Sequence, residues 1–326
     1  MRFFKLLLLL VALVAVLPAG ASAAFKVGIS ENNPPMFDDP NFKALDVKQT
    51  RLVMAYNAVT KANKGDDELT SRIIPYLAKA QAAGIDVLIA IEHARGAAEV
   101  CKSNRTLSQC KLPTDADYET NLRAFLQLFP QVKTITPWNE GNHFTQPTSR
   151  NPKAAARFTD IAVRVCKELN RKCKILFADV LDQADSAKAK KPKFKSTLRW
   201  IKTYKRALKA KIKSGTCGIH NYSDVNRFRD TGTKTIIKAL GCKDYWFTET
   251  GGIAKFGSFK FDLKRQLKAT KYMFKLAKKN KKVKNVFVYT WYGGVTPRFD
   301  AGITERSADL TNSEPRPAYN EVKKYF

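Results

Sequence analysis

Two glutamates of this 326-residue sequence directly follow short apolar segments. Glu140 lies in the string TPWNEGN, and Glu249 lies in DYWFTETGG, where two glycines end the segment. Apolar runs of this length that stop at polar or glycine residues predict strands, so both carboxylates are expected at carboxyl ends of strands. Two carboxyl groups that face each other, one protonated and one ionised, are what cleavage of a glycosidic bond requires.

Further polar and aromatic side chains fall at or near other predicted strand ends. They are Arg51, Glu92, His93, Trp138, Asn139, Asp179, His220, Tyr222 and Trp291. The opposite ends of the same segments carry no comparable set. Because the carboxyl ends of barrel strands meet at one rim, we expect these side chains to form one site with the two glutamates.

The elements that must position this site are apolar runs that alternate with amphipathic segments. Eight strands are predicted, over residues 25–30, 51–56, 85–92, 132–139, 175–179, 217–222, 245–249 and 286–291. The clearest helices are predicted at residues 66–83, 115–128, 152–169, 196–211, 225–240, 261–279 and 318–325. Eight such alternations favour an α/β fold with a parallel sheet closed as a (β/α)8 TIM barrel in a single domain. An open doubly wound sheet is disfavoured, since no G-x-G-x-x-G follows the first strand.

The order and placement of these motifs resemble the clan A glycoside hydrolases. That superfamily carries catalytic glutamates at the ends of strands 4 and 7 of a (β/α)8 barrel, and an Asn-Glu pair like Asn139–Glu140 ends strand 4. The resemblance covers essentially the whole mature chain. It implies a retaining enzyme that cleaves β-linked bonds of oligo- or polysaccharides by double displacement. Glu249 would be the nucleophile, Glu140 the general acid/base, and Asn139 a donor to the sugar 2-hydroxyl.

The same resemblance implies roles for four further residues. Arg51 resembles the strand 2 arginine that holds the nucleophile ionised, and Tyr222 resembles the strand 6 tyrosine that donates a hydrogen bond to it. His220 is placed like the polar neighbour of that tyrosine. Trp291 resembles the strand 8 tryptophan that forms the floor of the central sugar subsite.

Two more residues, Trp138 and His93, are candidates for contact with the substrate. The sequence departs from the clan pattern where WNEGN stands for the WNEP of many members, and where Glu92 precedes His93 without an assigned role. A less solvated Glu140 is expected to keep its proton near neutrality.

The amino-terminal segment and the cysteines indicate an exported protein. Residues 1–23 have a basic start, a leucine-rich core and an Ala-Ser-Ala site, which is the layout of a secretory signal peptide. We therefore expect a secreted, extracellular, monomeric barrel over residues 24–326, without a membrane anchor after cleavage. Disulfides are expected in that compartment, and neighbours in sequence suggest three pairs, although other pairings are open: Cys101 with Cys110, Cys166 with Cys173, and Cys217 with Cys242.

The composition is strongly basic, with 58 Lys and Arg against 29 Asp and Glu. A field of this sign predicts electrostatic association with anionic cell-wall polymers and no specific binding of nucleic acid. The alternative is that the lysines are solvated helix faces, which suits those near helix carboxyl termini.

Two other functions compete with glycoside hydrolysis. A metal-dependent hydrolase would place His93, His143, His220 and Glu92 around an activated water, but the sequence has no H-x-H or H-x-x-x-H pair. We therefore expect neither a metal nor another cofactor. A catalytically silent, basic barrel could instead bind cell-wall polysaccharide without cleaving it.

Overall fold

The computed structural model describes residues 25–60, 67–94, 111–169, 171–186, 190–257, 260–294 and 298–326. The predicted signal peptide and the predicted Cys101–Cys110 pair lie outside these ranges. No helix within them is both long and apolar enough to cross a bilayer.

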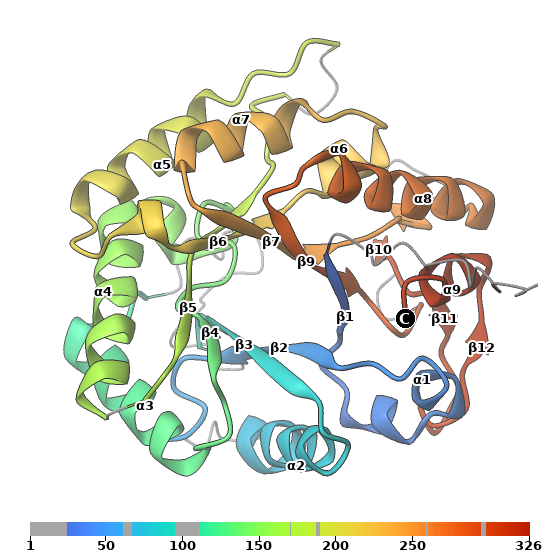
Figure 1. Ribbon diagram of the computed structural model, residues 1–326, viewed down its shortest axis with the longest axis horizontal. Helices are drawn as coiled ribbons and strands as arrows, with labels where there is room; N and C mark the ends of the chain where they lie inside the picture. Colours follow the sequence, from blue (N-terminus) through green and yellow to red (C-terminus); the bar gives the residue numbers. More distant parts are fainter. Residues whose placement is uncertain are drawn as a thin grey trace, which may run out of the picture.

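Eight parallel strands close into a barrel in the order β1-β2-β3-β4-β5-β6-β7-β9, which Figure 1 shows end-on. The last strand pairs with the first, with Asn285 opposite Lys26. This closed sheet confirms the predicted (β/α)8 TIM barrel. The strands are β1 (Lys26–Ser30), β2 (Gln49–Ala55), β3 (Asp86–Glu92), β4 (Thr134–Thr136), β5 (Lys174–Leu181), β6 (Thr216–His220), β7 (Asp244–Thr250) and β9 (Val283–Tyr289).

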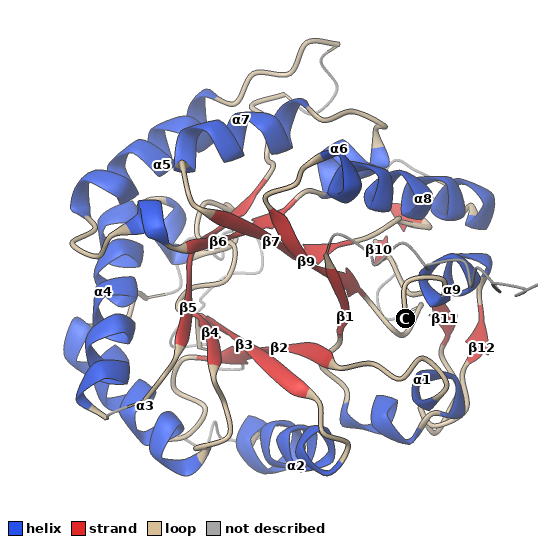
Figure 2. Cartoon of the chain, in the orientation of Figure 1, coloured by secondary structure: helices blue, strands red, loops and turns tan. Residues whose placement is uncertain are grey.

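Helices form the outer layer around the strands (Figure 2). Several helices are capped at the amino terminus by a side chain. Thr114 accepts a hydrogen bond from the Asp117 backbone N–H at the start of α3, and Asp262 accepts one from the Arg265 backbone N–H at the start of α8. The helices are α1 (Pro40–Lys43), α2 (Ile74–Ala82), α3 (Asp115–Leu128), α4 (Pro152–Glu168), α5 (Lys195–Ala207), α6 (Tyr222–Asn226), α7 (Thr231–Leu240), α8 (Leu263–Lys279) and α9 (Pro317–Lys323).

Alternate residues of the strands face two separate cores. Leu88, Leu176, Trp246 and Phe287 form one small buried cluster, whereas residues next to them in sequence, such as Ile89, join the large core shared with the helices. A period of two along buried strands is expected when one face points into a barrel and the other to its helices. Arg51 and Asp179 are both fully buried: Arg51 lies opposite Leu88 in register, and Asp179 lies near the carboxyl end of β5.

Three predicted boundaries were wrong near the site. The strand predicted over residues 132–139 is the three-residue β4, so Asn139 and Glu140 lie on the loop after it. The predicted sixth strand ends at His220, and Tyr222 begins α6. The helix predicted over residues 225–240 is divided into α6 and α7, because the chain turns at Phe228, whose φ is 54°.

Two short antiparallel ribbons lie among the loops. β8 (Lys255–Phe256) pairs with β10 (Phe299–Asp300), and β11 (Thr304–Glu305) pairs with β12 (Glu314–Pro315). Arg316 holds the two ribbons together, since its guanidinium binds Asp300 at 2.7 Å and Glu305 at 2.7 Å. The β8–β10 ribbon is used again below because its phenylalanines line the candidate site.

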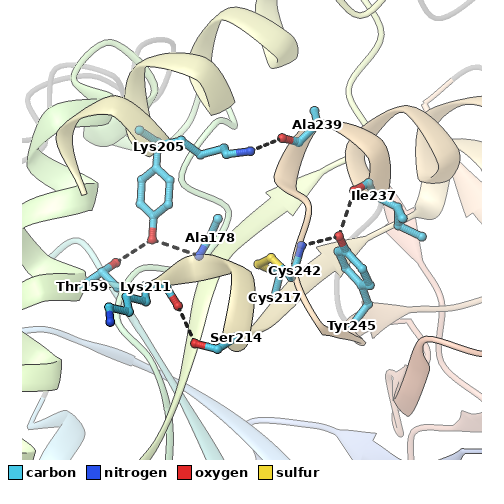
Figure 3. Close-up of a disulfide and its surroundings, with 11 residues drawn as sticks. Thr159, Ala178, Lys205, Lys211, Ser214, Cys217, Ile237, Ala239, Cys242 and Tyr245 are labelled. Carbon is cyan, nitrogen blue, oxygen red and sulfur yellow. Dashed lines mark hydrogen bonds between the residues drawn. A yellow bond between two sulfur atoms is a disulfide. The ribbon is translucent and has the colours of Figure 1, made fainter. Parts of the chain in front are cut away.

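Two of the three predicted disulfides are present among the described residues. Cys166 is bonded to Cys173 across the turn after α4, and Cys217 of β6 is bonded to Cys242 after α7. Figure 3 shows the second bridge beside Tyr245, whose hydroxyl accepts the Cys242 backbone N–H and donates to the Ile237 carbonyl, both at 2.8 Å. The bridge therefore joins the barrel strand β6 to the turn that follows α7.

Candidate active site

A cavity of about 480 Å³ opens at the carboxyl ends of the strands. Both candidate glutamates reach it from different sides: Glu249 from β7 and Glu140 from the loop after β4. The other lining residues are His143, Phe144, Leu181, Asp182, Gln183, Ala184, Tyr222, Ser223, Asn226, Arg227, Ile253, Phe256, Tyr289 and Phe299. The rim predicted to hold the chemistry is thus a real concavity.

Two residues fix the carboxylate of Glu249. Arg51 Nη1 donates to Glu249 Oε2 at 2.7 Å, and the hydroxyl of Tyr222 donates to Oε1 at 2.9 Å. The Arg51 side chain is fully buried, so its charge acts where solvent screens little. Each oxygen of Glu249 therefore has one donor on the protein.

Glu140 is held by two histidines on a strained backbone. Its φ is 45°, in the left-handed region that residues with a Cβ seldom adopt. His220 Nδ1 lies 3.0 Å from Oε1, and His143 Nδ1 lies 3.4 Å from Oε2. One carboxylate oxygen of Glu140, one of Glu249 and a ring nitrogen of His220 all lie within 4.8 Å of one another.

Asp179 of β5 supports this arrangement from below. Its Oδ2 lies 3.1 Å from His220 Nε2 and 3.4 Å from Arg51 Nη2, and Thr248 donates to Oδ1. A register shift on β5 at Ala178, where φ is 44°, returns Asp179 to the inward face. Gly218 on β6 leaves the space, because a Cβ there would lie 2.1 Å from Asp179 Oδ1.

These contacts set the charge of the site. Burial by itself lowers the pKa of His220, but the carboxylates of Asp179, Glu249 and Glu140 outweigh it and raise that pKa to about 10. Burial raises the pKa of Glu140, whereas the hydrogen bond from His220 and the charge of His143 bring it below its ordinary value. In the free site at neutral pH, the proton lies on His220 and Glu140 is ionised.

The expectation that Glu140 itself keeps a proton near neutrality is therefore wrong for the free site. It rested on weak solvation alone, and Glu140 is indeed poorly solvated. The sequence did not reveal that an imidazolium would lie 3.0 Å away, which favours the charged carboxylate more than burial disfavours it.

Asn139 and Glu92 form a buried layer under the two glutamates. Asn139 Oδ1 accepts from Arg51 Nη2 at 2.7 Å, and its amide nitrogen donates to Glu92 Oε2 at 3.1 Å. Gln146 donates to the same Glu92 oxygen at 3.3 Å. Glu92, which had no assigned role in the glycoside hydrolase interpretation, thus orients the amide of Asn139 against Arg51.

Four residues predicted to contact the substrate do not line the cavity. One is Asn139, whose amide nitrogen donates to Glu92. Trp291 is fully buried beyond the end of β9, where its indole donates to Asp39 at 3.2 Å and packs against Phe42. Trp138 is 4% exposed and packs against both Tyr118 and Phe158.

His93 is half-buried and also lies outside the cavity lining, with Nδ1 2.8 Å from the Ala94 carbonyl. Trp291 lies two residues past the end of β9 at Tyr289, and its ring packs against Phe42 and Tyr319 rather than facing the cavity. Tyr289 of β9 lines the cavity instead.

The sequence interpretation missed the aromatic wall on one side of the site. Phe299 packs edge-to-face against Tyr222 at 5.7 Å and against Phe256 at 5.8 Å, and Tyr289 lies 6.1 Å from it. Phe256 and Phe299 face each other across the β8–β10 ribbon. Only their position in loops after strands 7 and 8 could have indicated them.

Comparison with known proteins supports the architecture. No family model and no curated protein matches the sequence. Solved structures do match. They include a GH10 xylanase from Bispora sp. MEY-1 with xylobiose (TM-score 0.62, 12% identity, covering 92% of this chain and 96% of that one). A xylanase from Paenibacillus barcinonensis also matches (TM-score 0.62, 10% identity, 92% and 97% covered).

A β-glucosidase from Thermotoga maritima in complex with glucoimidazole is similar as well (TM-score 0.56, 12% identity, 92% and 97% covered). This chain has the barrel fold of these enzymes. At such identities the likeness concerns the fold, and the chemistry must be argued from the side chains.

The cluster of Glu140, His220 and Glu249 also has the spacing of metal ligands. Its chemistry does not fit a cation. A histidine ligand must be neutral, whereas the pKa of His220 is raised to about 10, and the guanidinium of Arg51 already binds Glu249. His93, proposed above as a ligand of the alternative metal site, lies outside the cavity lining.

Proposed function

We propose that this protein is a secreted, retaining glycoside hydrolase with Glu249 as nucleophile and Glu140 as general acid/base. The observation that carries the proposal is the separation of the two carboxylates, whose nearest oxygens lie within 4.8 Å. Retaining enzymes place the two groups about 5–5.5 Å apart, whereas inverting enzymes leave a wider gap that admits a water molecule. The short separation supports direct attack by one carboxylate.

In the first step, Glu249 attacks the anomeric carbon and the glycosidic C–O bond breaks. The departing oxygen takes a proton from Glu140, and that proton originates on His220, 3.0 Å from Glu140 Oε1. The products are a glycosyl ester on Glu249 and a free alcohol. Arg51 and Tyr222 hold the Glu249 carboxylate ready for attack, one on each oxygen.

In the second step, a water molecule replaces the alcohol. Glu140, which is ionised again after giving its proton to the alcohol, accepts a proton from this water. The oxygen of the water attacks the anomeric carbon and releases Glu249. The proton returns to the Glu140–His220 pair, so the site regains its original charge. Two displacements at the same carbon restore the original anomeric configuration.

The substrate class follows from the cavity and from the structural neighbours together. The names of the matching enzymes, an endo-β-1,4-xylanase and a β-glucosidase, indicate β-linked substrates. The open cavity of about 480 Å³ accommodates part of an oligosaccharide. Two disulfides among the described residues are consistent with an oxidising compartment and hence with export. We therefore propose a β-linked oligo- or polysaccharide as the substrate.

Substitution of the two glutamates tests these roles. E249A is expected to abolish turnover, because no attacking group remains. E140A is expected to retain activity on aryl glycosides with good leaving groups, which need no protonation, and azide should rescue its slow second step. NMR of the first product should show the β-anomer.

The opposite results would separate the alternatives. Equal loss in both variants without azide rescue would contradict the assigned roles. No hydrolysis by the wild-type protein across a panel of β-linked glycans, combined with binding to one of them, would favour the catalytically silent barrel.

A further inference from the structure

The solvent face of α8 consists entirely of lysines. All exposed residues of this 17-residue helix are Lys264, Lys268, Lys271, Lys275, Lys278 and Lys279, and the helix contains no acidic residue. The first five define what we call the α8 lysine face. Their spacing of three and four residues places them in one row about 21 Å long.

Neighbouring lysines in this row repel one another. Like charges three or four residues apart destabilise a helix, and each lysine of the row has such a neighbour on at least one side. Acidic residues at these positions would have stabilised the same helix. Folding of α8 therefore gives no reason for the row, since its buried residues, including Met273 and Phe274, already hold it on the barrel.

Nearby carboxylates do not neutralise the row. Within the described ranges, Asp230 forms an ion pair with Lys279 and Lys234, but no carboxylate lies within 4.0 Å of the five lysines of the α8 lysine face. Asp262 at the start of the helix accepts the Arg265 backbone N–H. Two of the five contact rings instead: Lys268 lies over Phe228 and Lys278 over Tyr325.

On the outer face of α3 and α4, by contrast, basic side chains are paired with acidic ones. There Glu119 binds Arg123 at 2.7 Å, and Arg164 binds both Glu119 and Glu168. The high net charge of the chain is thus distributed unevenly over its surface, with compensated helices on one side and the α8 lysine face on another.

The positive surface continues beyond the end of α8. The chain passes through Lys281 and Lys282 to Lys284, which lines a cavity of about 500 Å³ at the amino ends of the strands with Lys26 and Lys174. Asp86 is the one acidic side chain of that lining. Burial lowers the pKa of Lys174, and the charges of Lys26 and Lys243 lower it further, although Asp244 opposes them.

We propose that the α8 lysine face binds an acidic polysaccharide. A row of evenly spaced charges suits a linear polymer with one anionic group on successive sugars. The surface differs from one suited to nucleic acid. Lysines present single charges without the planar fork of arginine, and the two rings that contact the row, Phe228 and Tyr325, already lie under Lys268 and Lys278. The apolar residues of α8 are buried or half-buried and none is exposed, so the helix presents no apolar face for insertion into a lipid surface.

The helix α8 lies in the outer layer around the strands (Figure 1), and none of its lysines lines the cavity that holds the carboxylate pair. Binding there holds the enzyme on an anionic matrix while the cavity stays open to a neutral glycan. The inference therefore goes beyond the proposed hydrolysis and does not depend on it.

The test measures binding to polygalacturonate, a linear polyuronate, in 50 mM and 300 mM NaCl. One variant removes four charges of the α8 lysine face: K264Q, K268Q, K271Q and K275Q. A matched control removes four exposed lysines elsewhere and so has the same net charge: K43Q, K153Q, K167Q and K213Q. A third variant carries arginine at the first four positions and keeps the charge.

At low salt, the first variant is expected to bind about tenfold more weakly, with a shallower dependence on salt, and the control less than twofold more weakly. The arginine variant should bind like the wild type. Thermal melting should show that the glutamine variant is folded, since it loses repulsive pairs and one surface contact, that of Lys268 with Phe228.

Three results would overturn the proposal. Equal weakening in the glutamine variant and the control would mean that only net charge matters. Loss of binding in the arginine variant would show that the interaction is not electrostatic, and tighter binding to DNA than to polygalacturonate would identify another class of partner. Hydrolysis of a neutral aryl glycoside should be the same in the wild type and in all variants. If none of these proteins hydrolyses it, that result contradicts the proposed glycosidase activity and leaves the binding result unaffected.

Discussion

His220 is the residue on which the charge of the candidate site depends. Its Nε2 faces Asp179 at 3.1 Å and its Nδ1 faces Glu140 at 3.0 Å, in a fully buried position. Because both nitrogens face carboxylates, the imidazolium is favoured and its pKa is raised to about 10. A single proton is thus shared at the point where the proposed reaction needs one.

The first prediction at this scale concerns pH. H220N keeps a polar group near Glu140 but removes the stored proton. The alkaline limb of kcat/KM, which reports the free enzyme, should move to lower pH in the variant, because Glu140 then loses its proton without an imidazolium to replace it. Parallel pH profiles of wild type and H220N check this, and an unchanged alkaline limb would contradict the role of His220.

The same shift makes a prediction about stability. The folded pKa of His220, about 10, lies above its ordinary value of 6.5, so its charge contributes stability that is fully present below pH 6.5. That contribution is lost as the pH rises toward 10. The free energy of unfolding, measured with urea, should therefore fall more over this pH interval for the wild type than for H220N. An equal fall in both proteins would contradict the raised pKa of His220.

A third prediction at the residue scale concerns Tyr222. Y222F removes the hydroxyl that donates to Glu249 Oε1 at 2.9 Å and leaves the ring that packs on Phe299. A hydrogen bond to a charged group is worth enough to lower kcat/KM by about ten- to a hundredfold. Steady-state kinetics measure this, with the melting temperature as a check that packing is kept.

At the scale of elements, loops and short ribbons complete what the strands begin. The barrel strands supply Arg51, Asp179, His220, Glu249 and Tyr289. The remaining residues come from segments beyond the ends of these strands: Glu140, Tyr222, Phe256 and Phe299. Phe256 is 45% exposed at the tip of the β8–β10 ribbon and contributes more to the cavity than to the core.

F256A should therefore affect binding more than folding. We expect KM for oligosaccharides to rise about fivefold, because a ring face available to a sugar is lost, and the melting temperature to change little. F326A is the matched control, since Phe326 is 40% exposed at the last residue and lies outside the cavity lining. A similar KM in both variants would contradict a role of the ribbon in binding.

Strand periodicity made the barrel and the two glutamates predictable, because alternating apolar residues leave few places for a carboxylate except a strand end. The sequence did not predict which residues near the end of a strand face the cavity. Trp291 stands only two residues past β9 and is buried against Asp39, while Tyr289 reaches the cavity. Contacts between distant segments, such as His220 with Glu140, decide protonation and leave no local signal in the sequence.

At the scale of the whole molecule, covalent bridges tie strands to covering helices. The Cys217–Cys242 bridge spans 25 residues and the Cys166–Cys173 bridge spans 7. Loop-closure entropy predicts that the longer loop contributes more to the free energy of unfolding, about 3.5 against about 2.4 kcal/mol. Denaturant unfolding of C217S/C242S and C166S/C173S should give this order, and a reversed order would argue against an entropic origin.

The pairing of β1 with β9 has a consequence for how the chain is made. β1 is synthesised first among the barrel strands, yet one of its edges is covered only by the strand synthesised last. Until then the nascent chain exposes bare edges on both sides of the gap, which is where chains stick to one another. A protein stopped before β9 should consequently precipitate rather than persist as a smaller barrel, and chaperones should engage it until the ribosome releases its final segment.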